Sequence, residues 1–195
     1  MSSTSTATAG LVLAAGASSR MGYPKALLPL PSGTPLAMHQ MQLLRAAGCA
    51  RVAVVLGSAA EAIAKKITDG EVVKNPDWER GRLTSIQAGL RALPGQHGYL
   101  ILPVDTVGVQ VETLARLLRE SHGAAAALRP SHHGVPGRVL WIRADLAAEL
   151  LALPNQDTRL DEWLGDRVIE VPVDDPAVLN NINTPDDWAV VRENL

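Results

Sequence analysis

The sequence predicts an α/β protein whose single domain has three layers, with a mostly parallel sheet between two layers of helices. Apolar runs of strand length alternate with amphipathic stretches of helix length, which is typical of strands joined by helical crossovers. The strand candidates are continuously apolar, which indicates a sheet covered on both faces. The 195 residues fit one domain, since domains hold roughly 100–200 residues. We expect residues 1–9 to form a disordered leader and residues 10–195 to form the domain.

The strands follow from short apolar runs that are bounded by polar or turn-forming residues. We expect them at residues 11–15, 52–56, 71–74, 99–104, 124–128, 139–142 and 168–171. Residues 129–138, which include two prolines and two glycines, are predicted to form the longest loop. Ligands of such sheets bind beyond the carboxyl ends of the strands, so the residues that follow each strand are the first candidates for function.

The helices follow from apolar residues at helical spacing, and several have a recognisable end. We expect them at residues 35–47, 59–67, 84–93, 111–121, 145–153 and 184–193. Gly48 follows the first helix at the position where a left-handed residue is favoured, and Pro94 with Gly95 ends the third. Thr184 caps the last helix, because Pro185 and an acidic residue at the third position follow it.

Composition excludes several classes of protein. The formal net charge of −2 gives no electrostatic attraction for nucleic acid or an anionic membrane. No apolar run approaches the ~20 residues of a transmembrane helix, and the first residues lack the charged and apolar regions of a secretory signal. Cys49 is the only cysteine, which excludes an intrachain disulfide and a cysteine metal cluster and favours the cytoplasm. With no Phe, the core must be largely aliphatic. Trp78, Trp141 and Trp188 lie within a few residues of proposed site segments, and core packing is favoured for them over the alternative, a place in the pocket wall.

The loop after the first strand has the chemistry of a polyphosphate site. Gly16, Ala17 and Ser18 are small, so backbone N–H groups can approach phosphate oxygens closely. Arg20 offers a planar fork of donors and Lys25 a compact charge. The loop lacks both the G-x-G-x-x-G fingerprint and the Walker A pattern. The alternative is an ordinary glycine-rich turn with surface cations, and the two cations so close to a strand end favour the phosphate site.

The same loop resembles the signature of the nucleotidyltransferase superfamily. It is similar to the MobA-like branch, the molybdenum cofactor guanylyl- and cytidylyltransferases, in the pattern Leu13-Ala14-Ala15-Gly16-x-Ser18-x-Arg20-Met21-Gly22-x-x-Lys25. The resemblance implies a Rossmann-like three-layer fold of the nucleotide-diphospho-sugar-transferase type. It also implies a nucleotide-binding loop made of Leu13, Ala14, Ala15, Gly16, Ala17, Ser18, Ser19, Arg20 and Lys25. In the family the Arg and Lys are catalytic, because they neutralise the triphosphate and the Lys supports the transition state.

Asp105 ends the apolar strand predicted at 99–104 and is a candidate magnesium ligand, because Mg²⁺ takes oxygen ligands and keeps several waters. The residues alone allow a helix-capping role equally well. The resemblance implies that this Asp is catalytic and holds the metal. The family usually has Asp-x-Pro here, whereas this chain has Val107.

Asn183 is the second candidate metal ligand, and its amide oxygen would bring no charge. The segment Asn181-x-Asn183-Thr184-Pro185 is similar to the guanylyl branch, since the cytidylyl branch typically has Asp-Ile-Asp-Thr-Pro. Ala15, by contrast, resembles the cytidylyl branch, where guanylyl enzymes tend to have Gly. The two ends of the chain therefore favour different bases.

Further candidates lie on the base and acceptor sides. The element Gly81-x-x-x-Ser85-x-x-x-Gly89 resembles the family element that lies near the base and ribose. Arg82 would bind a phosphate of nucleotide or acceptor, or would simply be a solvated residue at a helix start. Gly89, in mid-helix, needs a packing reason such as close contact with the sheet. On the acceptor side we consider Asn181, His133 and Arg159, although the histidine also fits an ordinary loop.

The resemblance extends over nearly the whole chain and is strongest in residues 11–29, 81–105 and 180–188. It implies a magnesium-dependent nucleotidyltransferase that transfers CMP from CTP to the phosphate of molybdopterin, with release of pyrophosphate. The alternatives are GMP transfer from GTP, a sugar- or alcohol-phosphate acceptor, or a carrier that binds nucleotide or cofactor without turnover. A molybdoenzyme or its chaperone is an expected protein partner.

Overall fold

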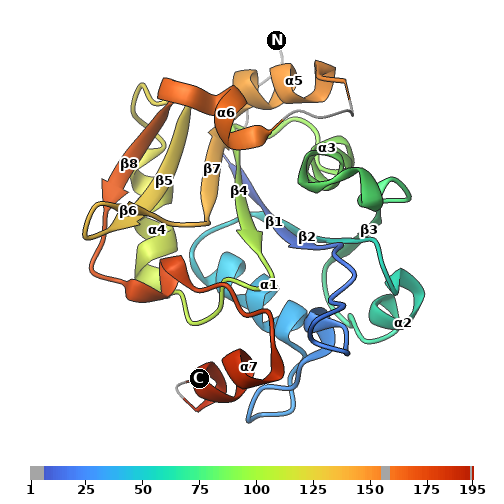
Figure 1. Cartoon of the computed structure of the whole chain (residues 1–195). Helices are drawn as coiled ribbons and strands as arrows, with labels where there is room; N and C mark the ends of the chain where they lie inside the picture. The colour runs from blue at the N-terminus through green and yellow to red at the C-terminus, as the bar shows by residue number, and fades with distance from the viewer. Residues whose placement is uncertain (1–6, 155–158, 194) are drawn as a thin grey trace.

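A computed structural model describes residues 7–154, 159–193 and 195. Within this part of the chain, eight strands form one sheet in the order β3-β2-β1-β4-β7-β5-β6, with β8 also paired to β5 (Figure 1). The strands are β1 (Thr8–Ala14), β2 (Arg51–Leu56), β3 (Glu71–Lys74), β4 (Gly98–Pro103), β5 (Ala127–His132), β6 (Val135–Pro136), β7 (Leu140–Arg143) and β8 (Val168–Pro172). The helices are α1 (Leu36–Ala46), α2 (Ala60–Ala64), α3 (Arg82–Ala92), α4 (Val111–Glu120), α5 (Ala144–Ala152), α6 (Leu160–Leu164) and α7 (Pro185–Arg192).

The sheet is mostly parallel, as the continuous apolar runs predict. Strands β3, β2, β1 and β4 are parallel neighbours, and β5 is parallel to β8. Strand β7 is antiparallel to both β4 and β5, and β6 is antiparallel to β5. The carboxyl end of β4 points toward the end of the molecule where α7 lies (Figure 1).

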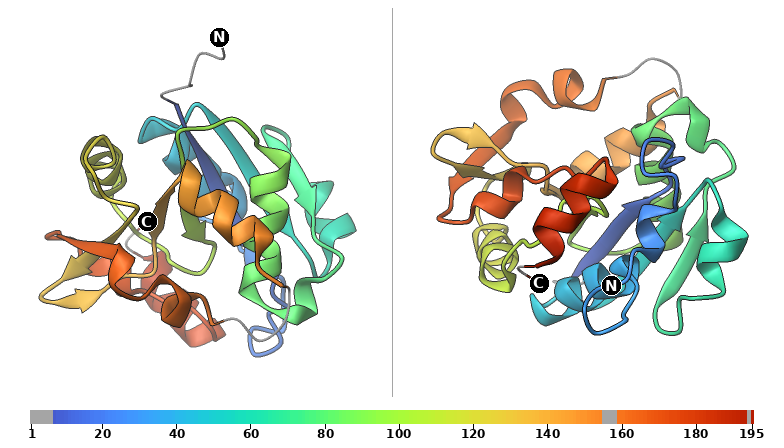
Figure 2. Two further views of the ribbon diagram at one scale, coloured as in Figure 1. Left: turned by 90° about the horizontal axis from the view of Figure 1, so that it is seen from above. Right: turned by 60° about the horizontal axis from the view of Figure 1, so that its bottom comes forward.

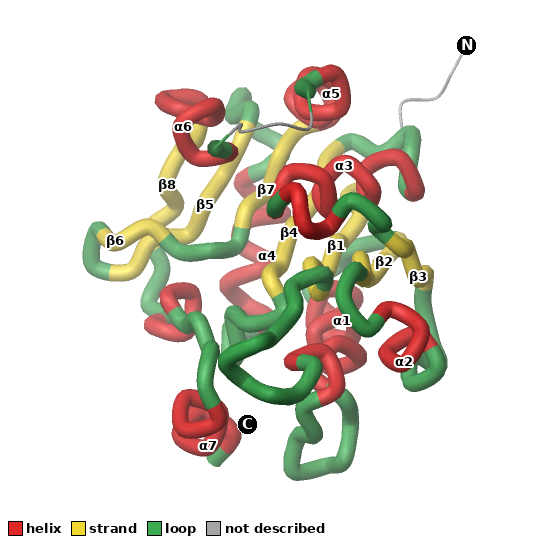
Figure 3. Tube along the Cα trace, turned by 45° about the vertical axis from the view of Figure 1, so that its right-hand side comes forward, coloured by secondary structure: helices red, strands yellow, loops and turns green. Residues whose placement is uncertain are grey.

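The sheet separates two apolar cores. Helices α3 and α5 cover one face, and α1 and α4 cover the other (Figure 3). The expected close contact at Gly89 is present: a Cβ added there would lie 2.8 Å from Leu11 Cδ1 on β1 and 3.1 Å from Val55 Cγ2 on β2. Glycine thus lets α3 pack directly on the centre of the sheet. No helix in the described residues has the length and apolarity required to cross a bilayer.

The structure corrects some boundaries. Strand β1 starts at Thr8, so Thr8 and Ala9 belong to the sheet rather than to a leader; residues 1–6 lie outside the described residues. Strand β5 spans 127–132 instead of the predicted 124–128, because pairing with β8 makes its polar half extended. The predicted loop at 129–138 therefore contains a hairpin, whose turn has positive φ at His133 (+49°) and Gly134 (+75°).

Candidate functional site

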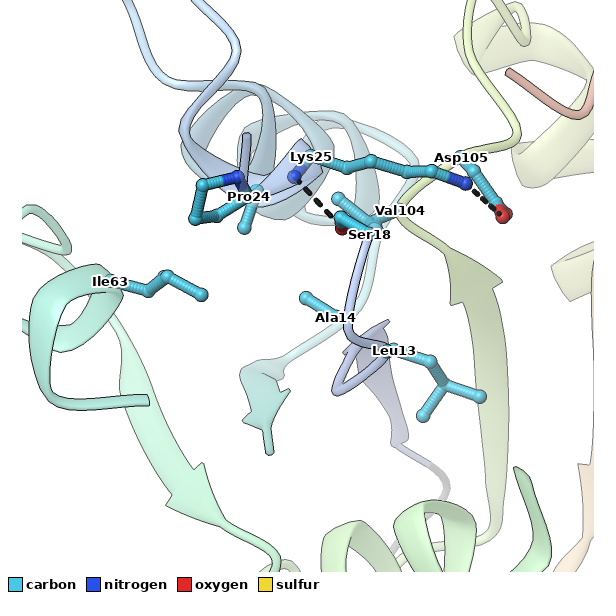
Figure 4. Close-up of a pocket in the computed structure, with 10 residues that line it drawn as sticks. Leu13, Ala14, Ser18, Pro24, Lys25, Ile63, Val104 and Asp105 are labelled. Atoms are coloured by element: carbon cyan, nitrogen blue, oxygen red, sulfur yellow. Dashed lines mark hydrogen bonds and ion pairs between the residues drawn. The ribbon is translucent and has the colours of Figure 1, made fainter. Parts of the chain in front are cut away.

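The loop after β1 is folded around Ser18. This residue has a positive φ of +54°, and its carbonyl accepts from the backbone N–H of Met21 (3.0 Å) and Gly22 (3.2 Å). Its hydroxyl accepts from the backbone N–H of Lys25 (3.2 Å), the first residue of a 3₁₀ turn that spans Lys25–Leu27 (Figure 4). These bonds close the loop on itself and fix where the Lys25 side chain leaves the backbone.

The Lys25 ammonium lies between the two oxygens predicted as metal ligands. It donates to Asp105 Oδ2 at 3.2 Å and to Asn183 Oδ1 at 3.0 Å. Arg20 Nη2 donates to the same Asn183 oxygen at 3.0 Å. Helix α7 begins at Pro185, two residues after Asn183. Figure 2 (right) shows this helix in red near the dark-blue loop after β1. Segments far apart in the sequence thus bring two cations and two candidate ligand oxygens to one point.

The loop that carries Asp105 is fixed from helix α1. The side chain of Gln40 is fully buried, and its amide nitrogen donates to the carbonyl of Thr106 (2.9 Å) and more weakly to that of Val104 (3.4 Å). These carbonyls flank Asp105 on both sides. The buried amide therefore sets the backbone from which the carboxylate projects.

A second support comes from the chain before α7. The backbone N–H of Ile182 donates to the carbonyl of Asp105 (3.0 Å), and Asn180 Nδ2 donates to that of Val107 (2.7 Å). Val107 itself is fully buried. The loop is thus held by packing and hydrogen bonds at the position where the family usually has proline, and the same bonds tie Asp105 to the segment of Asn181 and Asn183.

The position of Asn183 depends on the cap of α7. The Thr184 hydroxyl accepts from the Asp187 N–H (3.2 Å), and the Asp187 carboxylate accepts from the N–H groups of Thr184 (2.9 Å) and Asn183 (2.7 Å). The predicted cap is confirmed, and it also holds the backbone of Asn183. Hydrogen bonds to the Asp187 carboxylate from the backbone of Asn183, the backbone of Thr184 and the Thr184 side chain lower the pKa of Asp187.

Arg138 is a site residue that the sequence reasoning did not select. Its Nη2 lies 3.7 Å from Asp105 Oδ1, so each carboxylate oxygen faces a different cation. With the amide oxygen of Asn181 turned toward it, Arg138 Nη1 donates to that oxygen at 3.0 Å. Because β7 is antiparallel, with Ile101 of β4 opposite Leu140, the residues before β7 lie at the edge where β4 ends. Examining only the residues after each strand overlooks them.

Two cavities meet at this edge. The smaller, about 100 Å³, is lined by Leu13, Ala14, Gly16, Ser18, Pro24, Lys25, Ala26, Ile63, Val104 and Asp105 (Figure 4). The larger, about 360 Å³, is lined by Leu13, Ala15, Gly16, Trp78, Glu79, Gly81, Arg82, Ser85, Pro103, Asp105 and Arg138. Ala17 and Ser19 are exposed on the same loop. Trp141 and Trp188 are buried in the core as expected. Trp78, by contrast, is only half-buried and lines the larger cavity.

Positive charge gathers along the larger cavity. Arg82 Nη2 approaches the carbonyl of Arg138 at 3.4 Å. Desolvation, together with the like charges of Arg138 and Arg129, holds the pKa of Arg82 below its ordinary value, although Asp161 and Asp105 oppose the shift. The arginine stays protonated at neutral pH. The cavity is therefore suited to an anionic group beside Asp105.

The remaining acceptor-side candidates lie elsewhere on the described chain. Arg159 is exposed ahead of α6 and pairs with Glu162 at 3.1 Å. Helix α6 lies near α5, at the end of the molecule opposite α7 (Figure 1). His133 is exposed in the β5–β6 turn, with its ring 4.1 Å from that of His132. Neither residue lines the two cavities.

The oxygens of Asp105 and Asn183 suit a small divalent cation. They converge on one ammonium group, so a positive charge already occupies the point where both oxygens would bind a metal. Mg²⁺ is typically held by one or two protein oxygens, with substrate phosphates and waters completing its shell. The donor set fits that ion, provided that Lys25 moves onto phosphate oxygens.

Known proteins share both the sequence pattern and the fold. The family model of the MobA-like NTP transferase domain matches residues 10–171. The chain is 26% identical over 187 residues to the molybdenum cofactor cytidylyltransferase of Escherichia coli K12, with 94% of each covered. It is 35% identical over 192 residues to the molybdenum cofactor guanylyltransferase of Ralstonia nicotianae, with 90% of this chain and 91% of that enzyme covered.

A solved structure is similar over nearly its whole length. The crystal structure of Rv0371c from Mycobacterium tuberculosis H37Rv matches with a TM-score of 0.84 and 30% identity, covering 98% of this chain and 100% of that one. A complex of the same mycobacterial protein with manganese matches with a TM-score of 0.78 and 25% identity, covering 97% of this chain and 100% of that one.

Proposed function

The chain belongs to the MobA-like NTP transferase family and is a nucleotidyltransferase, and from this premise we propose that it transfers CMP from CTP to the phosphate of molybdopterin. Molybdopterin as acceptor is supported by relatives named for the molybdenum cofactor that cover nine-tenths or more of the chain. The single observation that supports the proposal most is the Lys25 ammonium bound to both Asp105 and Asn183, because the cation of the proposed phosphate loop then meets the two proposed metal ligands.

The choice of CTP is supported by Ala15 and by the cytidylyltransferase relative, which spans 94% of the chain. GTP is the second candidate. It is supported by the amides at Asn181 and Asn183, where the cytidylyl branch typically has acidic residues, and by the 35% identical guanylyltransferase.

In the proposed reaction, an oxygen of the acceptor phosphate attacks the α-phosphorus of CTP in line. A new P–O bond forms, and the bond between the α-phosphorus and the bridging oxygen of the leaving pyrophosphate breaks. The protein need not form a covalent bond; it positions the reactants and neutralises their charge. Lys25 and Arg20 bind the leaving pyrophosphate, whose negative charge grows in the transition state. Arg138, on the opposite oxygen of Asp105, binds the acceptor phosphate.

A divalent metal, which we propose to be Mg²⁺ held by Asp105 and Asn183, would polarise the α-phosphate and reduce the repulsion between the two anionic reactants. Lys25 then exchanges its contacts with these two oxygens for contacts with phosphate oxygens. Since Asn183 brings no charge, Asp105 supplies all of the negative charge that the proposed ligand pair offers the metal.

The substitution Asp105→Asn tests this role. It keeps the shape of the side chain and removes the charge, and we expect magnesium-dependent release of pyrophosphate to fall by on the order of 100-fold or more. Asp145→Asn is the matched control, because Asp145 also pairs with an arginine (Arg143, 2.7 Å) but lies at the start of α5. Undiminished turnover in Asp105→Asn would remove Asp105 from the mechanism.

The base is tested by thermal unfolding in the presence of magnesium and each of the four nucleoside triphosphates. A ligand that binds only the folded state raises the unfolding temperature, and at equal ligand concentration the tighter ligand gives the larger rise. We expect CTP to stabilise the protein most. A larger shift with GTP would replace the cytidylyl assignment with the guanylyl one.

A further inference from the structure

The half-buried indole of Trp78 lines the larger cavity, whereas the largest fully buried side chain of the described core is another tryptophan, Trp141. We propose that Trp78 is the stacking platform for the nucleobase, an inference that rests on the nucleotidyltransferase function proposed above.

Gly57, which follows β2, allows the Trp78 side chain to lie against the end of this strand. A Cβ added to Gly57 would lie 2.4 Å from Trp78 Cβ and 2.6 Å from the carbonyl oxygen of Ala15. Any larger residue would therefore push Trp78 away from the loop after β1. Glycine allows the tryptophan to sit against the strand end, immediately beside the residues that open the proposed phosphate loop.

The turn that carries Trp78 is also pinned to helix α3. Asn75 is buried, and its side-chain nitrogen donates to the hydroxyls of Thr84 (2.9 Å) and Ser85 (3.0 Å). Its side-chain oxygen accepts from the N–H of Asp77 (3.0 Å), and the Thr84 hydroxyl donates to the carbonyl of Asp77 (3.0 Å). The indole is thus ordered before any ligand arrives, which lowers the entropic cost of binding.

The larger cavity continues from the smaller one, which Lys25 lines. Leu13, Gly16 and Asp105 line both. A nucleotide with its phosphates at Lys25 therefore extends its nucleoside toward Trp78. Among the residues that line the larger cavity with Trp78, Ala15, Gly16 and Gly81 are small, which leaves room for a ligand. An aromatic face beside small residues favours a flat aromatic ligand, because offset stacking needs area rather than hydrogen-bond partners.

Stacking on an aromatic side chain serves every base, since each base has a π face. Trp78 is therefore expected to raise the affinity for the nucleoside part of CTP and of GTP alike, and to leave the affinity for the phosphate part unchanged. This difference separates stacking from a purely structural role, which would affect both parts.

The experiment measures binding of CTP, GTP and inorganic triphosphate, each with Mg²⁺, by calorimetry. For Trp78→Leu we expect the affinity for the nucleotides to fall by about 5- to 100-fold while the affinity for inorganic triphosphate is kept. Trp78→Phe should retain most of the nucleotide affinity. Trp163→Leu is the matched control, because Trp163, on α6, is also half-buried but stacks against Arg167, with 3.9 Å between the guanidinium carbon and the ring centre.

Nucleotide should also quench tryptophan emission in the wild type and in Trp163→Leu, and not in Trp78→Leu. Nucleotide binding that is unchanged in Trp78→Leu would overturn the proposal, as would an equal loss of affinity for inorganic triphosphate. A wild-type protein that binds none of the three ligands would instead overturn the proposed function itself.

Discussion

The substitution Gln40→Leu isolates what the buried amide contributes to the site. Gln40 lines neither of the two cavities. Its amide nitrogen nevertheless donates to the carbonyls on either side of Asp105, strongly to that of Thr106 at 2.9 Å and weakly to that of Val104 at 3.4 Å. Leucine fills a similar volume without donating. Leaving buried carbonyls without this donor costs about 1–3 kcal/mol, so we expect the free energy of unfolding to fall by that amount in urea denaturation.

Turnover should fall by more than stability alone explains. A misplacement of about 1 Å can reduce rate on the order of 100-fold, and Asp105 lies between the two released carbonyls. We therefore expect kcat for pyrophosphate release to drop at least tenfold at a temperature where the variant remains folded.

Gln87→Leu is the matched control for this prediction. Gln87 is also fully buried, and its amide nitrogen also donates to two carbonyls, those of Leu150 (2.8 Å) and Leu153 (3.1 Å). These carbonyls belong to the end of α5. Both variants should lose similar stability, and only Gln40→Leu should lose turnover. A wild-type kcat in Gln40→Leu, or an equal loss of kcat in Gln87→Leu, would refute the reasoning.

Three further measurements test the packing and the titration of single groups. Gly89→Ala gains about 1 kcal/mol of helix propensity. It also forces a methyl group against the fully buried Leu11, which costs about 1–3 kcal/mol. Urea denaturation should therefore show a free energy of unfolding that is unchanged or lower by up to about 2 kcal/mol. Burial raises the pKa of the Cys49 thiol to about 12, so a thiol reagent at pH 8 should label the unfolded protein and not the folded one. The hydrogen bonds of the α7 cap lower the pKa of Asp187 from its ordinary value of 3.8. The stability that the ionised carboxylate contributes is present above its pKa in the unfolded chain and is lost as the pH falls through its pKa in the folded protein. In thermal unfolding between pH 7 and pH 3, the wild type should therefore lose more stability than Asp187→Asn.

Much of the fold is predictable from the sequence because the central strands are continuous apolar runs. Runs such as 52–56 and 99–104 have no polar face, so they must lie between two helical layers. Strand β5 cannot be predicted in this way, because it contains Arg129, Pro130, Ser131 and His132. Its polar residues are extended because 129–131 pair with β8 and 131–132 pair with β6. Its hairpin with β6 depends on positive φ angles that no periodicity predicts.

The candidate site, like the fold, is predictable from the sequence only in part. Lys25 and Asp105 are 80 residues apart, yet each follows a parallel strand, and the carboxyl ends of such strands share one edge of the sheet. Arg138 reaches this edge from the opposite direction, because β7 is antiparallel, and strand direction cannot be read from composition. Trp78 can lie against the end of β2 because Gly57 has no side chain there, a close approach that no local pattern predicts.

The central claim is that this site joins a nucleotide to a phosphorylated acceptor rather than merely binding either one. The most direct test incubates the protein with Mg²⁺, molybdopterin and CTP labelled at the α-phosphate, and follows the label by chromatography together with released pyrophosphate. We expect the label to move into a pterin–cytosine dinucleotide, with one pyrophosphate released for each product. Nucleotide that binds but stays intact with every acceptor tested, sugar phosphates included, would contradict it and indicate a carrier.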